Sequence, residues 1–445
     1  MSANRLRARD VALAVVRDVF PPAGSRAIER SAQGALDYRA TGARLTERDT
    51  AFAVELAYGT IKMRRAVDWY LAPFLSSTDG PLGERGVIRE ILRLAVYELA
   101  YTRPDEHATV FEFVNLAIRR GHRGLGNLVN AVLRNFLRRR PPAPVREEFE
   151  SEEDFLATRY SLPTWLVRQW REVFGERAEA VCAGVNEPPA GAVVVNTLKA
   201  PAEEAIRQMD AKGLRVRPSS IVPESVLTDG SRANDGRWWP QSESSAMVVD
   251  VLGPQPGETI LDFCSGNGNK ALQIGARMRG EGSLTCVESD ARKTATLQRR
   301  LAQGDVGACI VTGDATAEIL PAEQRFDRAL VDAPCSGVGI VGRHPEARWK
   351  KQGGDGERLA VTQRALLERA ARHVHPGGAL VYAVCSTDPR ETTEVIDGFL
   401  ARENFERGLI PAAYVPFLTA QGDVLVPPGI ERRDGFFIAR LERRL

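Results

Sequence analysis

Two cysteines stand where apolar runs typical of buried strands come to an end. Cys335 lies in the segment DAPCSGVG, which follows the apolar run 329–331, and Cys385 directly follows the apolar run 379–384. The carboxyl ends of parallel strands meet at one edge of a sheet, and α/β proteins bind their ligands there. Because Asp332 opens the same segment as Cys335, this setting predicts thiol chemistry, with a separate role for each sulfur rather than a disulfide between them.

Three further cysteines show no comparable setting. For Cys182, Cys286 and Cys309, a small apolar residue of the core is the simpler interpretation. The chain has six cysteines in all, with no CxxC pair and no histidines at zinc-finger spacing. The sequence therefore predicts neither a structural metal site nor a disulfide framework.

A turn rich in glycine and asparagine follows the first strand expected in the C-terminal half. Residues 264–270 read CSGNGNK, and both residue types tolerate a positive φ, which lets the backbone approach a ligand closely. Glu288 ends the next expected strand, where a carboxylate can bind ribose hydroxyls, and Asp314 follows the third in the segment TGDA. The turn lacks the GxGxxG and GxxxxGK[ST] patterns of dinucleotide and nucleoside triphosphate sites. We therefore expect S-adenosylmethionine, an adenosine-containing sulfonium, as the cofactor.

A thiol beside a methyl donor indicates a carbon acceptor. Nitrogen and oxygen acceptors carry lone pairs, whereas carbon 5 of a pyrimidine does not. Attack of a thiolate on carbon 6 makes carbon 5 enamine-like, so that it can take a methyl group from a sulfonium. A free cysteine has a pKa of ~8.5, so the thiolate needs nearby positive charge or dipoles. Asp332 could hold the edge of a cytosine ring, and a second thiol or a bound base must help to remove the carbon 5 proton.

The N-terminal third carries an excess of positive charge. Residues 1–140 hold 23 Lys and Arg against 15 Asp and Glu, a net of +8, whereas the rest of the chain has a net of −6. A stretch without any acid contains the arginines Arg119, Arg120, Arg123, Arg134, Arg138, Arg139 and Arg140. Such a cluster predicts contact with nucleic-acid phosphates. A solvated helix end followed by a basic linker is the alternative interpretation.

The spacing of apolar residues divides the chain into regions. Residues 1–140 show helical periodicity in stretches broken by prolines, which predicts an all-α bundle, and 141–150 reads as a proline-rich linker. Residues 151–237 mix helical stretches with two strands and predict a small α+β module. In 238–445 short apolar strands alternate with helices, which predicts a mostly parallel, Rossmann-like sheet. The strands expected in that sheet are Thr259–Phe263, Ser283–Val287, Ala308–Val311, Ala329–Val331 and Ala379–Val384.

Taken together, these motifs resemble the NOL1/NOP2/Sun family of RNA cytosine-5 methyltransferases. The likeness rests on Asp262–Lys270, on the segment DAPCSGVG and on Tyr382–Ser386, and it extends to the segment DGFF at 434–437. The N-terminal segments LRLAVYEL and VNAVLR resemble a NusB-like RNA-binding domain, so the resemblance covers nearly the whole chain. A fusion of this kind is similar to bacterial enzymes that methylate small-subunit rRNA.

The resemblance implies a role for each matching residue. It implies that Cys385 is the nucleophile, that Cys335 resolves the covalent adduct, and that Asp332 is the acid that contacts both cytosine and cofactor. The implied cofactor contacts are Cys264, Ser265, Gly266, Asn267, Gly268, Asn269, Lys270, Glu288, Lys293, Asp314 and Asp332. The implied activity is S-adenosylmethionine-dependent methylation of cytosine C5 in 16S rRNA.

Two other interpretations stay open. One is the same chemistry on tRNA. The other is an RNA-binding factor of ribosome assembly or antitermination with an impaired methyltransferase domain, because the first motif reads CSGNGNK where the family usually has CAAPGGK. Retention of Asp332, Cys335 and Cys385 favours an active enzyme. Since the chain has no run of ~18 apolar residues, we expect no segment that spans a membrane. We also expect a cytoplasmic monomer that binds RNA.

Overall fold

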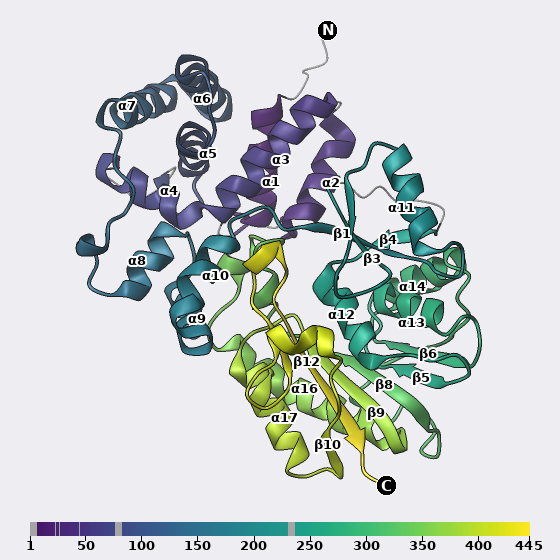
Figure 1. Cartoon of the computed structure of the whole chain (residues 1–445). Coiled ribbons are helices and arrows are strands. Elements are labelled where there is room, and N and C mark those ends of the chain that lie inside the picture. Colours follow the sequence, from purple (N-terminus) through teal and green to yellow (C-terminus); the bar gives the residue numbers. More distant parts are fainter. Residues whose placement is uncertain (1–6, 23, 26, 44, 76–81, 230–235) are drawn as a thin grey trace. The chain divides into compact units, whose positions relative to one another are not determined.

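The computed structural model describes residues 7–22, 24–25, 27–43, 45–75, 82–229 and 236–445, which form two compact units (Figure 1). Unit 1 consists of Met1–Arg168 together with His344–Lys350. Unit 2 consists of Gln169–Arg343 and Lys351–Leu445. None of the described helices is long and apolar enough to cross a membrane.

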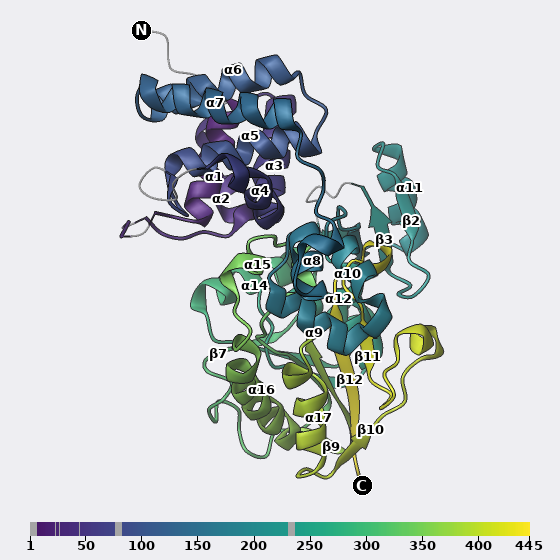
Figure 2. The same cartoon turned by 90° about the vertical axis from the view of Figure 1, so that its left-hand side faces the viewer.

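The N-terminal part of unit 1 is a bundle of helices that bury their apolar faces against one another (Figure 2). These helices are α1 (Ala8–Val19), α2 (Ala32–Ala43), α3 (Glu47–Lys62), α4 (Arg64–Leu71), α5 (Val87–Tyr101), α6 (Glu106–Arg120) and α7 (Arg123–Arg139). Polar side chains cap some of the helix starts, as where the Asp105 carboxylate accepts a hydrogen bond from the Ala108 N–H at α6. The all-α bundle expected from the apolar spacing is confirmed.

Unit 1 also contains a segment from much later in the sequence. Besides α8 (Glu152–Arg159) and the first turns of α9 (Thr164–Phe174), it includes the short helix α15 (Ala347–Lys350). Within unit 1, the Trp349 indole N–H donates to Ile61 O at 2.6 Å. The segment that follows the DAPCSGVG motif therefore returns to the helical bundle before the chain re-enters unit 2.

The first part of unit 2 contains a small antiparallel sheet with the strand order β2-β3-β1-β4. Its strands are β1 (Gly191–Val195), β2 (Val216–Pro218), β3 (Ser225–Thr228) and β4 (Trp238–Pro240). The helix α11 (Ala202–Ala211) packs on it through Ala205 and Met209, and α10 (Ala178–Gly184) precedes it. The α+β module is confirmed. Two of its strands, β3 and β4, are too short to give a clear apolar period, and the sequence did not predict them.

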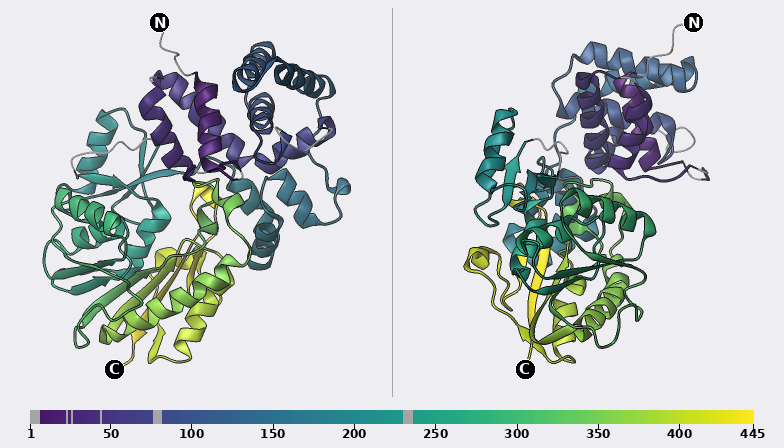
Figure 3. Two further views of the ribbon diagram at one scale, coloured as in Figure 1. Left: turned by 180° about the vertical axis from the view of Figure 1, so that it is seen from behind. Right: turned by 90° about the vertical axis from the view of Figure 1, so that its right-hand side faces the viewer.

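The rest of unit 2 is built on a large sheet (Figure 3). Its strands lie in the order β10-β12-β9-β8-β5-β6-β7, and β11 joins the sheet by pairing with β12. The strands are β5 (Thr259–Asp262), β6 (Ser283–Glu288), β7 (Cys309–Thr312), β8 (Phe326–Asp332), β9 (Val374–Val384), β10 (Phe405–Arg407), β11 (Val424–Val426) and β12 (Phe436–Arg443). Strands β5 to β9 pair in parallel, and β10, β11 and β12 add an antiparallel edge. The Rossmann-like α/β fold is confirmed.

Helices cover both faces of this sheet. One face packs against α12 (Glu243–Leu252), α13 (Asn269–Arg277) and α14 (Ala291–Gln303), and the other against α16 (Asp355–Arg372) and α17 (Thr393–Leu400). Successive strand residues point to opposite faces, so Ile260 belongs to the first core and Leu261 to the second. Burial on both faces explains why these strands are short continuous apolar runs.

One expectation about the cysteines is wrong. Cys182 and Cys286 are buried, as expected of core residues, but Cys309 is exposed. Cys309 begins β7, which lies at the edge of the sheet and has a neighbouring strand on one side only. An edge strand leaves side chains open to solvent that a central strand would cover.

Candidate active site

The two cysteines at the strand ends lie next to each other. Strands β8 and β9 pair with Asp332 opposite Ala383, and the Ala333 N–H donates to Ala383 O at 2.9 Å. This register brings the Sγ atoms of Cys335 and Cys385 to 3.3 Å from each other. Both side chains are free, half-buried thiols. The site can therefore present one sulfur for attack while the other handles a proton.

The surroundings of Cys335 favour its protonated form. Its pKa is raised well above the ordinary thiol value by the hydrogen bond with Cys385, by burial and by the negative charge of Glu391. A protonated Cys335 can donate a hydrogen bond to the Cys385 sulfur. A thiol with a raised pKa is also a stronger base once it has lost its proton. The pair suits a division into a nucleophile and an acid or base.

Asp332 is held by a residue from the glycine-rich turn. The Nζ atom of Lys270 lies 2.5 Å from Oδ2 of Asp332 and 5.6 Å from the centre of the Phe436 ring. The two charged side chains are only 11% and 28% exposed, so water screens their attraction weakly. Lys270, expected at the cofactor, thereby also reaches the expected catalytic acid.

The turn 264–270 obtains its shape from glycine rather than asparagine. Gly266 and Gly268 have φ values of 55° and 87°, in the left-handed region, whereas Asn267 and Asn269 are not among the residues with positive φ. A Cβ atom added to Gly268 would lie 2.6 Å from a methyl group of Leu297. The expectation that asparagine supplies left-handed geometry is wrong here. The turn keeps its shape because its two glycines occupy the positions that require it.

Two carboxylates flank this turn. Glu288, at the end of β6, accepts a hydrogen bond from the Gly266 N–H at 2.9 Å and is 7% exposed. Asp262, at the end of β5, is 1% exposed, and neither of its carboxylate oxygens has a hydrogen-bond partner among the described residues. Burial and the charge of Asp332 raise the pKa of Asp262 to about 7. Sequence reasoning did not list Asp262 as a site residue, although an acid that ends an apolar strand before such a turn was a usable signal.

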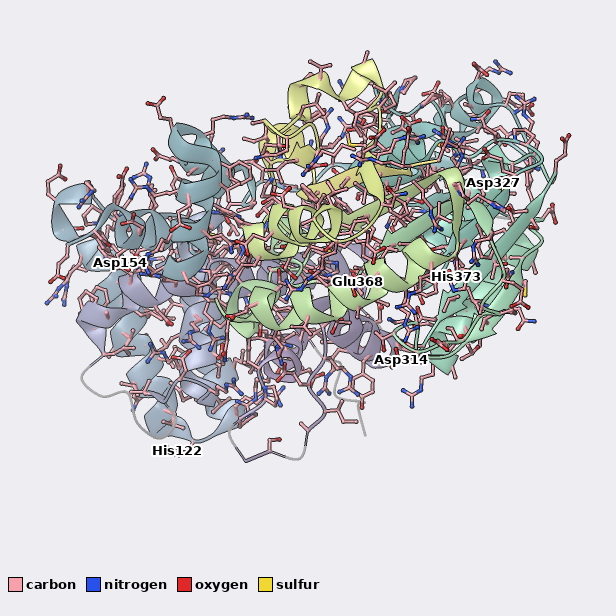
Figure 4. All side chains as sticks on the ribbon, turned by 90° about the horizontal axis from the view of Figure 1, so that it is seen from below. His122, Asp154, Asp314, Asp327, Glu368 and His373 are labelled. Carbon is pink, nitrogen blue, oxygen red and sulfur yellow. The ribbon has the colours of Figure 1, made fainter. Side chains whose placement is uncertain are left out.

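The other expected cofactor residues lie around the same edge. Cys264 is half-buried, and its pKa is raised well above the ordinary value by burial and by three nearby carboxylates, which keeps it a thiol. Lys293 is exposed on α14, and its charge acts on Cys264 in the opposite direction. Asp314, labelled in Figure 4, is exposed beyond the edge strand β7 and accepts hydrogen bonds from the N–H and hydroxyl of Thr316. The turn 264–270, Asp262 and Glu288 thus lie close together, while Lys293 and Asp314 lie at the edge of this group.

The seven arginines of the basic stretch are all exposed at the end of α6, along α7 and at its C-cap. Arg119 and Arg120 both pair with Asp10, at 2.9 and 3.2 Å, and Arg140 pairs with Glu106 at 3.0 Å. The members without an ion pair in the described part of the chain are Arg123, Arg134, Arg138 and Arg139. Part of the cluster is therefore neutralised locally, and part is open to a polyanion.

Three separate stretches of the chain match known protein families. Residues 249–442 match the family described as 16S rRNA methyltransferase RsmB/F, residues 6–138 match the NusB family, and residues 162–233 match the ferredoxin-like domain of RsmF/B-like methyltransferases.

Curated proteins similar to the chain span most of its length. A probable ribosomal RNA small subunit methyltransferase B of Bacillus subtilis is 34% identical over 90% of this chain and 92% of its own length. The protein of the same description in Synechocystis is 30% identical over the same shares, and ribosomal RNA small subunit methyltransferase B of Serratia proteamaculans is 29% identical over 89% of this chain and 91% of its own length.

Solved structures show the same fold. The crystal structure of PH0851 aligns over the full length of both chains with a TM-score of 0.81 at 24% identity. NSun6 from Pyrococcus horikoshii, solved with SFG, covers 63% of this chain and 98% of its own with a TM-score of 0.57 at 18% identity.

Proposed function

The chain belongs to the ribosomal RNA small subunit methyltransferase B family of S-adenosylmethionine-dependent RNA methyltransferases, and on this premise we propose that it methylates carbon 5 of a cytosine in 16S rRNA. The observation that carries the proposal is the distance of 3.3 Å between the sulfurs of Cys335 and Cys385, beside the ion pair of Asp332 and Lys270. Methylation of nitrogen or oxygen would need no such thiol pair.

The residues around the turn fit S-adenosylmethionine. Glu288 keeps acceptor capacity for the ribose hydroxyls, and the glycines leave the backbone of the turn open to close approach. The buried carboxylate of Asp262, whose oxygens have no hydrogen-bond partner in the described part of the chain, is suited to the positively charged methionine end of the molecule. S-adenosylmethionine supplies, when bound, a methyl group on a positively charged sulfur.

The chain's own residues account for activating and releasing the base. The thiolate of Cys385 forms a bond to carbon 6, and the electron pair of the 5,6 double bond moves to carbon 5, which takes the methyl group. Asp332 holds the N3 edge of cytosine, where protonation offsets the developing negative charge. The carbon 5 proton can pass only to a deprotonated Cys335, so the Cys335 thiol first gives its own proton to solvent. Cys335 then accepts the proton from carbon 5, the double bond re-forms, the bond between carbon 6 and Cys385 breaks, and the proton held at N3 returns to solvent. The sum of these steps is one methyl group gained and one proton released.

The substrate is proposed from the family and the helical domain. The family matched by 249–442 is described by its action on 16S rRNA, and the curated relatives are described by their action on small-subunit rRNA. The NusB-like bundle and its exposed arginines provide a phosphate-binding surface in unit 1. A target base inside a helix must be flipped out or already unpaired to reach Cys385.

The proposal is tested with purified protein, 16S rRNA, tRNA and S-adenosylmethionine. We expect bisulfite sequencing to find 5-methylcytosine at a defined site of the 16S rRNA after reaction with the wild type, and none after reaction with Cys385→Ala. Methylation of tRNA alone would show that the substrate is tRNA rather than 16S rRNA. If the protein binds rRNA but neither binds S-adenosylmethionine in calorimetry nor methylates, the chain is an RNA-binding factor with an impaired domain.

A further inference from the structure

A buried carboxylate lies behind the two thiols. Glu391 ends the short 3-10 helix Pro389–Glu391, six residues after Cys385, and its side chain is completely buried. Its Oε1 accepts hydrogen bonds from the Ser336 N–H at 2.8 Å and from Gln363 Nε2 at 2.9 Å. Its Oε2 accepts from the hydroxyls of Ser336 and Ser386. The single carboxylate thus has four hydrogen-bond donors around it.

These donors come from both catalytic loops. Ser336 directly follows Cys335, and Ser386 directly follows Cys385. The two serine hydroxyls also lie 3.1 Å from each other. Since each serine is covalently next to a catalytic cysteine, its bond to Glu391 adds to the strand register in fixing how far apart the two sulfurs lie.

The groups that hydrogen-bond Glu391 are all uncharged. As a carboxylate, Glu391 can accept all four hydrogen bonds, from one backbone N–H, one amide and two hydroxyls. The neighbouring Arg390 pairs with Asp388 instead, at 2.6 Å. Neutral donors therefore hold the negative charge, and they do so close to Cys335, whose raised pKa reflects it.

Further contacts fix Glu391 itself. The Tyr382 hydroxyl donates to the Glu391 carbonyl at 2.7 Å, and Gln363 also donates to Pro334 O at 3.0 Å. Both anchors come from rigid elements, since Tyr382 is on β9 and Gln363 on α16. Glu391 is therefore held, at its backbone carbonyl by Tyr382 and at its carboxylate by Gln363, by elements other than the two loops that it joins.

We propose that Glu391 is a positioning residue for methyl transfer, which holds the loops of Cys335 and Cys385 together and places a negative charge close to Cys335. This inference rests on the proposed covalent mechanism. A reaction of two sulfurs with the neighbouring ring carbons 5 and 6 depends on placement within fractions of an ångström, and a misplacement of about 1 Å can cost about 100-fold in rate. Because Glu391 is completely buried behind the two loops, its effect passes through them.

The test is Glu391→Gln, which keeps the size of the side chain and removes its charge. We expect single-turnover methylation to slow by about 100-fold, while the affinities for rRNA and S-adenosylmethionine stay close to those of the wild type. Asp388→Asn is the matched control, because Asp388 is a buried carboxylate of the same segment whose side chain bonds Arg390 instead. We expect the control to methylate at nearly the wild-type rate. Equal rates for Glu391→Gln and the wild type would overturn the proposal.

A second readout does not depend on turnover. Alkylation of Cys335, followed by mass spectrometry over a range of pH, reports the charge state of that thiol in the free protein. Loss of the negative charge in Glu391→Gln should move the Cys335 profile toward lower pH, and Asp388→Asn should leave it in place. A profile that does not move would contradict the electrostatic part of the inference, even if the wild type proved inactive on cytosine.

Smaller changes cover the case in which Glu391→Gln does not fold. Ser336→Ala and Ser386→Ala each remove one hydroxyl contact and leave the carboxylate bonded to the other donors. We expect each to slow methylation by about tenfold, in line with the loss of one hydrogen bond to a charged group. Wild-type rates in both variants would show that the carboxylate does not act through the serines.

Discussion

Lys270, in the first turn of α13, places its ammonium nitrogen 2.5 Å from a carboxylate oxygen of Asp332, at the end of β8. The contact joins the turn expected to bind the cofactor to the segment that carries Cys335. One lysine therefore serves both halves of the site, and its removal should affect the reaction more than cofactor binding.

Replacement of Lys270 by Gln tests this role. Without the ammonium group, the half-buried Asp332 loses its positive partner and its fixed orientation toward the base. We expect the methylation rate to fall by about 100-fold, the size of effect that follows removal of one preorganised electrostatic group. Calorimetry should show a much smaller loss in S-adenosylmethionine affinity. If the affinity falls as far as the rate does, Lys270 acts at the cofactor alone.

Glu288 should contribute directly to cofactor affinity. Its replacement by Ala removes a charged acceptor for the ribose hydroxyls, so the binding free energy of S-adenosylmethionine should weaken by roughly 1.5–3 kcal/mol. Because Glu288 also bonds the Gly266 N–H, thermal unfolding must first confirm that the variant is folded. Asp314→Ala should lower the affinity less, since this carboxylate, also expected at the cofactor, is exposed and bonds its own turn through Thr316. Unchanged affinity in a folded Glu288→Ala protein would exclude Glu288 from the cofactor site.

The sequence predicted that Cys335 and Cys385 meet at one edge of the sheet because strand ends are local features. Cys335 and Cys385 follow apolar runs, and in a parallel sheet such ends meet at one edge. The sequence could not show that Glu391 lies behind both thiols or that Lys270 reaches Asp332. Those contacts depend on strand register and on packing between residues 28 to 62 positions apart. The helix α15 has only four residues, too few for a helical period of apolar residues. The sequence therefore could not show that this helix belongs to unit 1.

The basic stretch of unit 1 should contribute a salt-dependent share of RNA binding. Replacing Arg138, Arg139 and Arg140 by Ala should weaken rRNA binding and reduce the slope of log K against log salt by about 2. Filter binding at several salt concentrations measures both effects. Arg119 and Arg120, which pair with Asp10, should change the slope less when replaced. An unchanged slope in the triple variant would mark residues 138–140 as a solvated helix end and linker.

Asp262 should make stability depend on pH near neutrality. Its pKa in the folded protein, about 7, is above the ordinary value of 3.8, so the folded chain holds this proton more tightly than the unfolded chain does. The stabilisation that this provides is fully present below about pH 4 and is lost as the pH rises through about 7. Asp262→Asn has no such proton. In urea titrations we expect its free energy of unfolding, relative to the wild type, to rise between about pH 4 and pH 7.

A carboxylate whose pKa in the folded protein is lowered rather than raised provides the control for that experiment. Asp327, labelled in Figure 4, accepts hydrogen bonds from the N–H and hydroxyl of Thr259, which lower its pKa. Its stabilisation is present above the ordinary pKa and is lost as the pH falls through its lowered value. Asp327→Asn should therefore leave the dependence near neutral pH unchanged. If Asp262→Asn also leaves it unchanged, Asp262 is ionised throughout that range in the folded protein.

The two thiols should give opposite phenotypes, although their sulfurs lie only 3.3 Å apart. Without Cys385 no bond to carbon 6 can form, so Cys385→Ala should give neither adduct nor methylated RNA. Without Cys335 attack and methyl transfer can proceed, but proton removal stalls, so Cys335→Ala should accumulate a protein–RNA species that survives denaturing gels and requires S-adenosylmethionine. The double variant should trap nothing, because trapping requires prior attack. Trapping by Cys385→Ala alone would reverse the two roles, and methylation by both single variants would rule out covalent catalysis by these thiols.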